Sequence, residues 1–103
     1  MNDEGIGQYR IIGYIDELEE AERRIKINNL GDDLYKKIDE IHDALVDLQP
    51  FLATKEDNDK LKEYVEDLIG EVVLASGEGK VDKINELLVP ISEKVAMLRD
   101  ELD

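Results

Sequence analysis

The single histidine of the chain lies among carboxylates, and here side chains of the metal-ligand type come closest together in the sequence. His42 follows Asp39 by three positions and precedes Asp43. In a helix, residues three apart share a face, so Asp39 and His42 can contact one metal ion. A carboxylate-bridged di-iron bundle needs two Glu-x-x-His motifs, which one histidine cannot supply. We therefore interpret His42 as a surface histidine and predict no metal site.

Pairs of carboxylates three residues apart offer a second kind of chemistry. These pairs are Glu17 and Glu20, Glu40 and Asp43, and Glu63 and Glu66. The pair Glu40 and Asp43 resembles the magnesium-holding carboxylates of all-helical nucleotide pyrophosphatases, which implies a magnesium-dependent hydrolase acting on a nucleotide. However, 27 acidic residues make this spacing common, and no lysine or arginine motif marks a phosphate pocket. We interpret the pairs as solvated helix faces and keep the pyrophosphohydrolase as an alternative function.

Motifs for other chemistries are missing from the sequence. The run Asp57-Asn58-Asp59 is similar to the start of a calcium loop, but Lys62 replaces the glycine needed at the sixth position. There is no glycine-rich phosphate loop and no Gly-x-Ser-x-Gly elbow. The lack of cysteine excludes disulfides, thiolate metal sites and a cysteine nucleophile. We predict no catalytic residue and no cofactor, and hence a protein that is not an enzyme.

Four helical segments must position whatever site exists. The first is predicted at about residues 9–28 on the apolar stripe Ile11, Ile15, Leu18 and Ile25. Glu22 fills the position of that stripe between its last two members. The sequence Asn-Asn-Leu-Gly at residues 28–31 predicts the end of this helix. Residues 1–8 are expected to form a flexible N-terminus.

The second and fourth helices have unbroken patterns in which apolar residues alternate in steps of four and three. The second is expected to begin at Asp32 or Asp33, and its stripe is Leu34, Ile38, Ile41, Leu45, Leu48 and Leu52. The fourth is expected to begin at about Lys80, and its stripe is Ile84, Leu88, Ile91, Val95, Leu98 and Leu102. Pro50 should end the second helix near Leu48 or kink it, and Pro90 should kink or split the fourth.

The third helix is predicted to begin at Thr54, where the sequence is similar to a capping box, and to end at a turn over residues 76–79 that contains two glycines. Short connections favour antiparallel neighbours. The leading fold is therefore all-α, an antiparallel bundle of four helices in one domain over residues 1–103. A three-helix arrangement with a detached first helix is the main rival.

The third and fourth helices carry more apolar residues than one stripe needs. The extra residues, which point away from that stripe, are Ile69, Val73, Leu87 and Val89. Two accounts stay open. Either the first helix covers this second face, or the four residues form an interface with a second copy or with another protein.

The net charge of −14 bears on the choice of partner. Acidic residues occur along the whole chain, so its surface should repel nucleic acids and anionic membranes and attract basic proteins. No apolar run reaches the length of a membrane span, and the acidic N-terminus is unlike a secretory signal, so we expect a cytoplasmic protein. We expect a small acidic regulator that self-associates or binds a protein partner. A DNA-mimic inhibitor of a nucleic-acid-binding protein is an alternative, because carboxylates can imitate phosphate charge.

Overall fold

The computed structural model describes residues 3–52 and 54–102, and it describes side chains from Ile11 onward. The described part is all-helical and contains no strand. Its four long helices are α1 (Asp3–Ile27), α2 (Asp32–Leu48), α3 (Lys55–Glu78) and α4 (Val81–Leu102), and a short 3₁₀ turn, η1 (Gln49–Phe51), follows α2. The predicted all-α class and the number of helices are confirmed.

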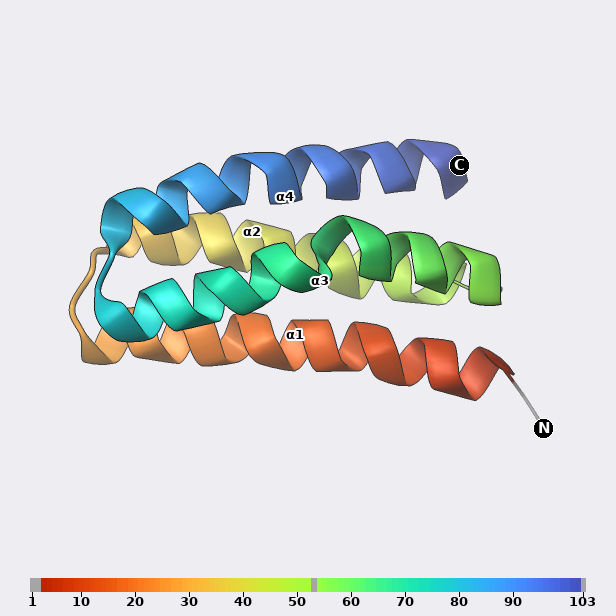
Figure 1. The fold of residues 1–103 in the computed structure, drawn as a ribbon, viewed down its shortest axis with the longest axis horizontal. Coiled ribbons are helices and arrows are strands. Elements are labelled where there is room, and N and C mark those ends of the chain that lie inside the picture. The colour runs from red at the N-terminus through yellow and green to blue at the C-terminus, as the bar shows by residue number, and fades with distance from the viewer. Residues whose placement is uncertain (1–2, 53, 103) are drawn as a thin grey trace.

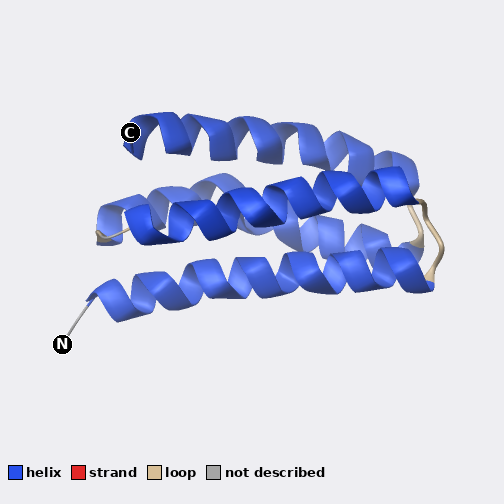
Figure 2. Cartoon of the chain, turned by 180° about the vertical axis from the view of Figure 1, so that it is seen from behind, coloured by secondary structure: helices blue, strands red, loops and turns tan. Residues whose placement is uncertain are grey.

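The four helices lie side by side, and the chain reverses direction at each connection (Figure 1). The view from behind shows the same arrangement, with the N- and C-termini at one end and the α1–α2 and α3–α4 connections at the other (Figure 2). Helix α1 packs against α2 and α3, and α4 packs against the same two helices. The first helix is therefore not detached, and α1 and α4 occupy opposite corners of the arrangement.

Helices α1 and α3 end in the same way. At the end of α1, Asn29 has a φ of 56° and the Leu30 amide donates to the Ile25 carbonyl. At the end of α3, Gly79 has a φ of 73° and the Lys80 amide donates to the Ala75 carbonyl. A residue with positive φ just after the helix lets a later amide satisfy a free terminal carbonyl, which stops the helix. The predicted stop after α1 is confirmed, whereas α3 continues through most of the predicted turn.

The helix starts agree only in part with the sequence. The hydroxyl of Thr54 accepts a hydrogen bond of 3.1 Å from the Asp57 amide, so Thr54 caps α3 as predicted. Helix α2 begins at Asp32, as predicted, but Gly31 precedes it and no side chain caps that end. The two aspartates lie in the first turn of α2, where they still favour the helix dipole.

The start of α1 differs from the prediction, and the two prolines have different effects. Helix α1 begins at Asp3, six residues before the predicted start, so the part of the N-terminus over residues 3–8 is helical. Pro50 follows the end of α2 and lies in η1, which confirms that it ends the second helix. Pro90 lies inside α4, which continues on both sides of it. The packing of α4 thus outweighs the hydrogen bond that Pro90 removes.

One core of buried side chains draws on all four helices. The predicted stripes of α2 and α4 are buried from Leu34 to Leu48 and from Ile84 to Leu98. Burying a leucine or isoleucine side chain stabilises the fold by about 1.5–3 kcal/mol. No helix among the described residues combines the length and the apolarity needed to cross a bilayer.

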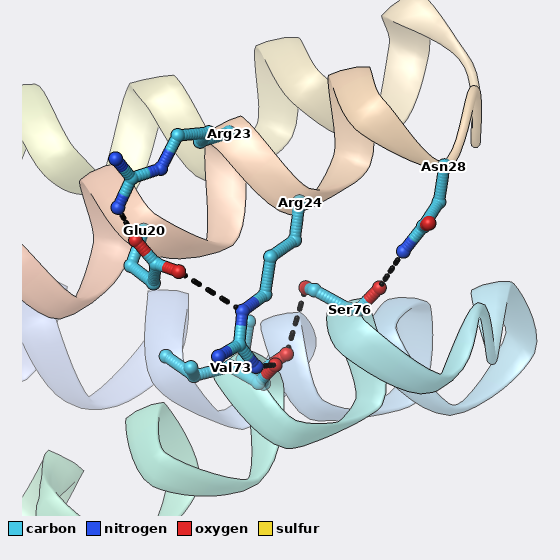
Figure 3. Close-up of polar contacts among 7 residues, drawn as sticks. Glu20, Arg23, Arg24, Asn28, Val73 and Ser76 are labelled. Atoms are coloured by element: carbon cyan, nitrogen blue, oxygen red, sulfur yellow. Dashed lines mark hydrogen bonds and ion pairs between the residues drawn. The ribbon is translucent and has the colours of Figure 1, made fainter.

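Polar side chains at the end of α1 and just after it donate hydrogen bonds to the backbone of α3 (Figure 3). Arg24 donates from Nη1 to the Val73 carbonyl at 3.1 Å, and Asn28 donates from Nδ2 to the Ser76 carbonyl at 2.9 Å. Arg24 also pairs with Glu20 on its own helix. These contacts join residues almost fifty positions apart, so they fix the register of α1 against α3.

Candidate functional site

The four residues predicted as a candidate interface occupy three different environments. Ile69 and Leu87 belong to the core, with exposed fractions of 0% and 7%. Val73 is half-buried and packs against the core, and only Val89 is exposed, at 59%. The burial of Ile69 and Leu87 is the arrangement in which the chain covers its own second apolar face. We therefore retain only Val89 from this set for a surface site.

Three hollows lie end to end along the side of the molecule formed by α2 and α4. Their volumes are about 460, 310 and 200 Å³. The first and second share Lys37 and Asn85, and the second and third share Glu40 and Ser92, so neighbouring hollows adjoin. We call this row of three hollows the α2–α4 groove. It follows α4 from Val81 to Arg99, which at a rise of 1.5 Å per residue is about 27 Å.

The bottom and the rim of the α2–α4 groove differ in chemistry. Apolar and small side chains line much of its length; they are Leu34, Ile41, Ala44, Val81, Leu88, Val89, Val95 and Ala96. The charged residues along it are Asp32, Asp33, Lys37, Glu40, Glu93 and Arg99. Four of these six are acidic. A partner lying in the groove would therefore meet an apolar strip with a net negative border.

Small residues on both walls explain why the helices leave this groove open. Ala44 on α2 faces the same hollow as Ser92 and Ala96 on α4. Their short side chains do not fill the space above the buried residues Ile41 and Val95. One exposed hydrogen bond of 3.1 Å, from Lys37 Nζ to Asn85 Oδ1, crosses the groove where the first and second hollows adjoin. An exposed bond of this kind is easily exchanged for other partners.

A second group of functional side chains lies between α1 and α2. The ligand-type atoms of Glu22, Asp39 and His42 all lie within 4.8 Å of one another. Glu22 is 9% exposed, and Asp39 and His42 are half-buried. We call this group the Glu22–Asp39–His42 cluster. Asp39 and His42 come one turn apart on α2, as the sequence predicted, and α1 adds a carboxylate that the sequence analysis did not assign to them.

The pKa of Glu22 is raised above its ordinary value, and burial is the largest cause. The charge of Asp39 and a hydrogen bond between the two carboxyl groups raise this pKa further, whereas His42 and a hydrogen bond from Tyr35 lower it. The Oε1 atom of Glu22 is buried and has no hydrogen-bond partner. The two carboxyl groups therefore lack enough compensating positive charge to be ionised together at low cost.

The predicted pair Glu40 and Asp43 does not form a shared site. Glu40 lies on the rim of the α2–α4 groove, and Asp43 is exposed, with Oδ1 at 3.3 Å from Nδ1 of His42. Neither joins a metal-type cluster within the described part of the chain. Asn58, from the rejected calcium loop, is buried and donates to the carbonyls of Leu52 and Thr54, so it holds the start of α3.

Sequence reasoning missed the grouping of Glu22 with Asp39 and His42, although one signal was available. Glu22 occupies a core position of the α1 stripe, between Leu18 and Ile25, and a carboxylate at such a position needs a partner. Comparison with protein-family models, with curated proteins and with solved structures finds no match to this chain.

Proposed function

We propose that this protein is a non-enzymatic interaction module that binds an amphipathic helix of a basic protein in the α2–α4 groove. The observation that supports the proposal is the row of adjoining hollows with an apolar bottom and a mainly acidic rim. An amphipathic helix lays its apolar face into such a groove and is anchored by residues spaced three and four apart. The antiparallel four-helix arrangement supplies the two parallel walls.

The dimensions of the groove support a helical ligand. Its length of about 27 Å matches five turns of an α-helix. The small side chains of Ala44, Ser92 and Ala96 allow a third helix to approach both walls closely. Val89, with 59% of its surface exposed, gives an apolar contact beside them.

The charge of the protein supports a basic partner over a second copy. Each chain carries a net charge of −14, so two copies repel each other as they approach. A cationic helix is instead attracted, and its lysines or arginines would meet Glu40 and Glu93 on the rim. Such attraction mainly speeds association and weakens with added salt. The acidic surface would then serve to attract the basic partner, whereas it would repel anionic membranes and nucleic acids.

The test uses a synthetic amphipathic peptide of about five turns, with leucines on one face and lysines on the other. Its binding to the full chain is measured by fluorescence anisotropy at two salt concentrations. Ala96→Glu places a large charged side chain in the groove and should weaken binding by more than about tenfold. Leu74→Glu adds the same charge at an exposed position of α3 that does not line the groove, and it should leave the affinity within about twofold.

Two results would overturn the proposal. Equal weakening by Ala96→Glu and Leu74→Glu would show that the peptide responds only to net charge. Light scattering that finds a stable dimer, disrupted by Ala96→Glu, would show that a second copy and not a basic helix occupies the groove.

A further inference from the structure

We propose that Glu22, Asp39 and His42 form a binding site for one divalent transition-metal ion, of which Zn²⁺ is the representative. The site joins α1 to α2 and is separate from the α2–α4 groove. It uses one carboxylate from α1 and a carboxylate and an imidazole one turn apart on α2. Three protein ligands leave a further coordination position for water or for a group from another molecule.

The environment of Glu22 favours a bound cation. Its side chain is more than nine-tenths buried, and its Oε1 atom has no hydrogen-bond partner. Among the ion pairs of the described residues, none joins Glu22 or Asp39 to a lysine or an arginine. A buried carboxylate next to a second carboxylate is costly unless a proton or a cation lies between them.

The spacing within the cluster suits a small ion. The candidate ligand atoms lie within 4.8 Å of one another, and Zn²⁺ binds oxygen and nitrogen at about 2.0–2.2 Å. We expect changes of side-chain rotamer to bring the three atoms to these distances, because Glu22 and the α2 residues belong to helices that already pack together.

The ligand types select among metals. An imidazole nitrogen disfavours Mg²⁺ and Ca²⁺, which prefer oxygen ligands, and favours Zn²⁺, Cu²⁺, Fe²⁺ or Ni²⁺. A histidine that binds a metal usually donates its second ring N–H to a carboxylate. His42 has one such acceptor, since Asp43 Oδ1 is 3.3 Å from Nδ1.

A shared proton between Glu22 and Asp39 is the competing arrangement, and it makes different predictions. A proton-sharing pair gives no saturable metal binding and does not need His42. Binding of Zn²⁺ that requires all three residues can only come from a site that they share.

The experiment is isothermal titration calorimetry, in which Zn²⁺ is added to the metal-free full chain at physiological salt. Millimolar Mg²⁺ is present to occupy weak sites on the acidic surface. We expect one Zn²⁺ per chain. Glu22→Gln and His42→Asn should each weaken binding by more than about tenfold. Glu17→Gln, which removes one carboxylate from the same helix outside the cluster, should bind Zn²⁺ as the wild type does.

Co²⁺ gives a second readout that does not depend on heat. Its visible absorption should appear on binding to the wild type and be lost in His42→Asn. Circular dichroism verifies that each variant keeps its helix content. The proposal is overturned if the wild type shows no saturable Zn²⁺ binding above the Mg²⁺ background, or if Glu22→Gln and Glu17→Gln bind Zn²⁺ equally.

Discussion

The side of the molecule that α1 closes and the side formed by α2 and α4 are built differently. Toward the end of α1, Arg24 and the following residue Asn28 donate part-buried hydrogen bonds to the α3 backbone. Along α2 and α4, small residues face each other and leave the α2–α4 groove, crossed by the exposed Lys37–Asn85 hydrogen bond. Helices α1 and α4 each pack against α2 and α3. The interface of α1 with α3 is closed, whereas that of α4 with α2 leaves a groove.

The difference teaches where stability and where recognition are located. Hydrogen bonds from side chains to backbone carbonyls fix one register and leave little room for another occupant. A groove lined by alanine, serine and valine does not itself set the register of its helices. We expect a ligand to cover its apolar bottom. We therefore expect substitutions on the α1 side to change folding, and substitutions in the groove to change binding.

The sharpest test of this division compares the same substitution at two positions from the predicted interface. Ile69→Asp places a carboxylate in the core and should cost about 4 kcal/mol or more in the free energy of unfolding, since a buried charge has no partner there. Val89→Asp, on the exposed wall of the groove, should change it by less than about 0.5 kcal/mol. Urea denaturation followed by circular dichroism measures both. A folded, stable Ile69→Asp protein would contradict the closed α1 side.

This pair of residues also shows how far the sequence could predict the fold. Steps of four and three identified all the buried residues of α2 and all those of α4 except Leu87, because each of those helices carries one continuous stripe. On α3, steps of four and three place Leu68 on the stripe. In the structure Leu68 is only half-buried, whereas its neighbour Ile69 is fully buried. Helix α3 packs against both α1 and α4, so its apolar surface is wide, and periodicity alone does not divide it between two neighbours.

The candidate sites were less predictable than the helices, for a related reason. The spacing of Asp39 and His42 is a local property and was visible in the sequence. The approach of Glu22 to them depends on the register of α1 against α2, which residue spacing within a helix does not contain. The groove depends on Ala44, Ser92 and Ala96, small residues whose effect appears only when the two helices that carry them are paired.

Two glycines of α3 sharpen the comparison with a smaller effect. Gly70→Ala introduces a methyl group into open space in the middle of the helix and should stabilise the protein by about 0.5–1 kcal/mol. At Gly77 the added carbon would lie 2.8 Å from Nη1 of Arg24, so the guanidinium must move away from the Val73 carbonyl. The loss of that hydrogen bond, about 1 kcal/mol, should cancel the gain in helix propensity.

Thermal and urea denaturation of Gly70→Ala, Gly77→Ala and the Arg24→Ala background measure this difference. When Arg24 is absent, Gly77→Ala should stabilise the protein as much as Gly70→Ala does. If Gly77→Ala is already as stabilising in the wild type, the contact of Arg24 with α3 contributes nothing to stability, and the α1 side is held by apolar packing alone.

The smallest expected effect concerns pH and the carboxylate that α1 buries against α2. The raised pKa of Glu22 means that the folded chain holds this proton more tightly than the unfolded chain. The stabilisation from protonated Glu22 is therefore present in acid and is lost as the pH rises from the ordinary carboxyl value through the raised pKa. The effect is small because His42 and Tyr35 oppose the contributions of burial and Asp39.

Glu22→Gln isolates this effect, because glutamine keeps the shape and cannot ionise. In the presence of a chelator, the stability of Glu22→Gln relative to the wild type should increase from acid to neutral pH. Glu17→Gln is the matched control: burial and the charge of Glu66 raise the pKa of Glu17, but this residue is exposed, so solvent should screen its effect. A constant difference between Glu22→Gln and the wild type across this range would mean that Glu22 is paired as well in the folded chain as in water. The α1–α2 contact would then need neither a proton nor a metal ion, and the contrast between a polar, closed α1 side and an apolar, open groove would rest on α3 alone.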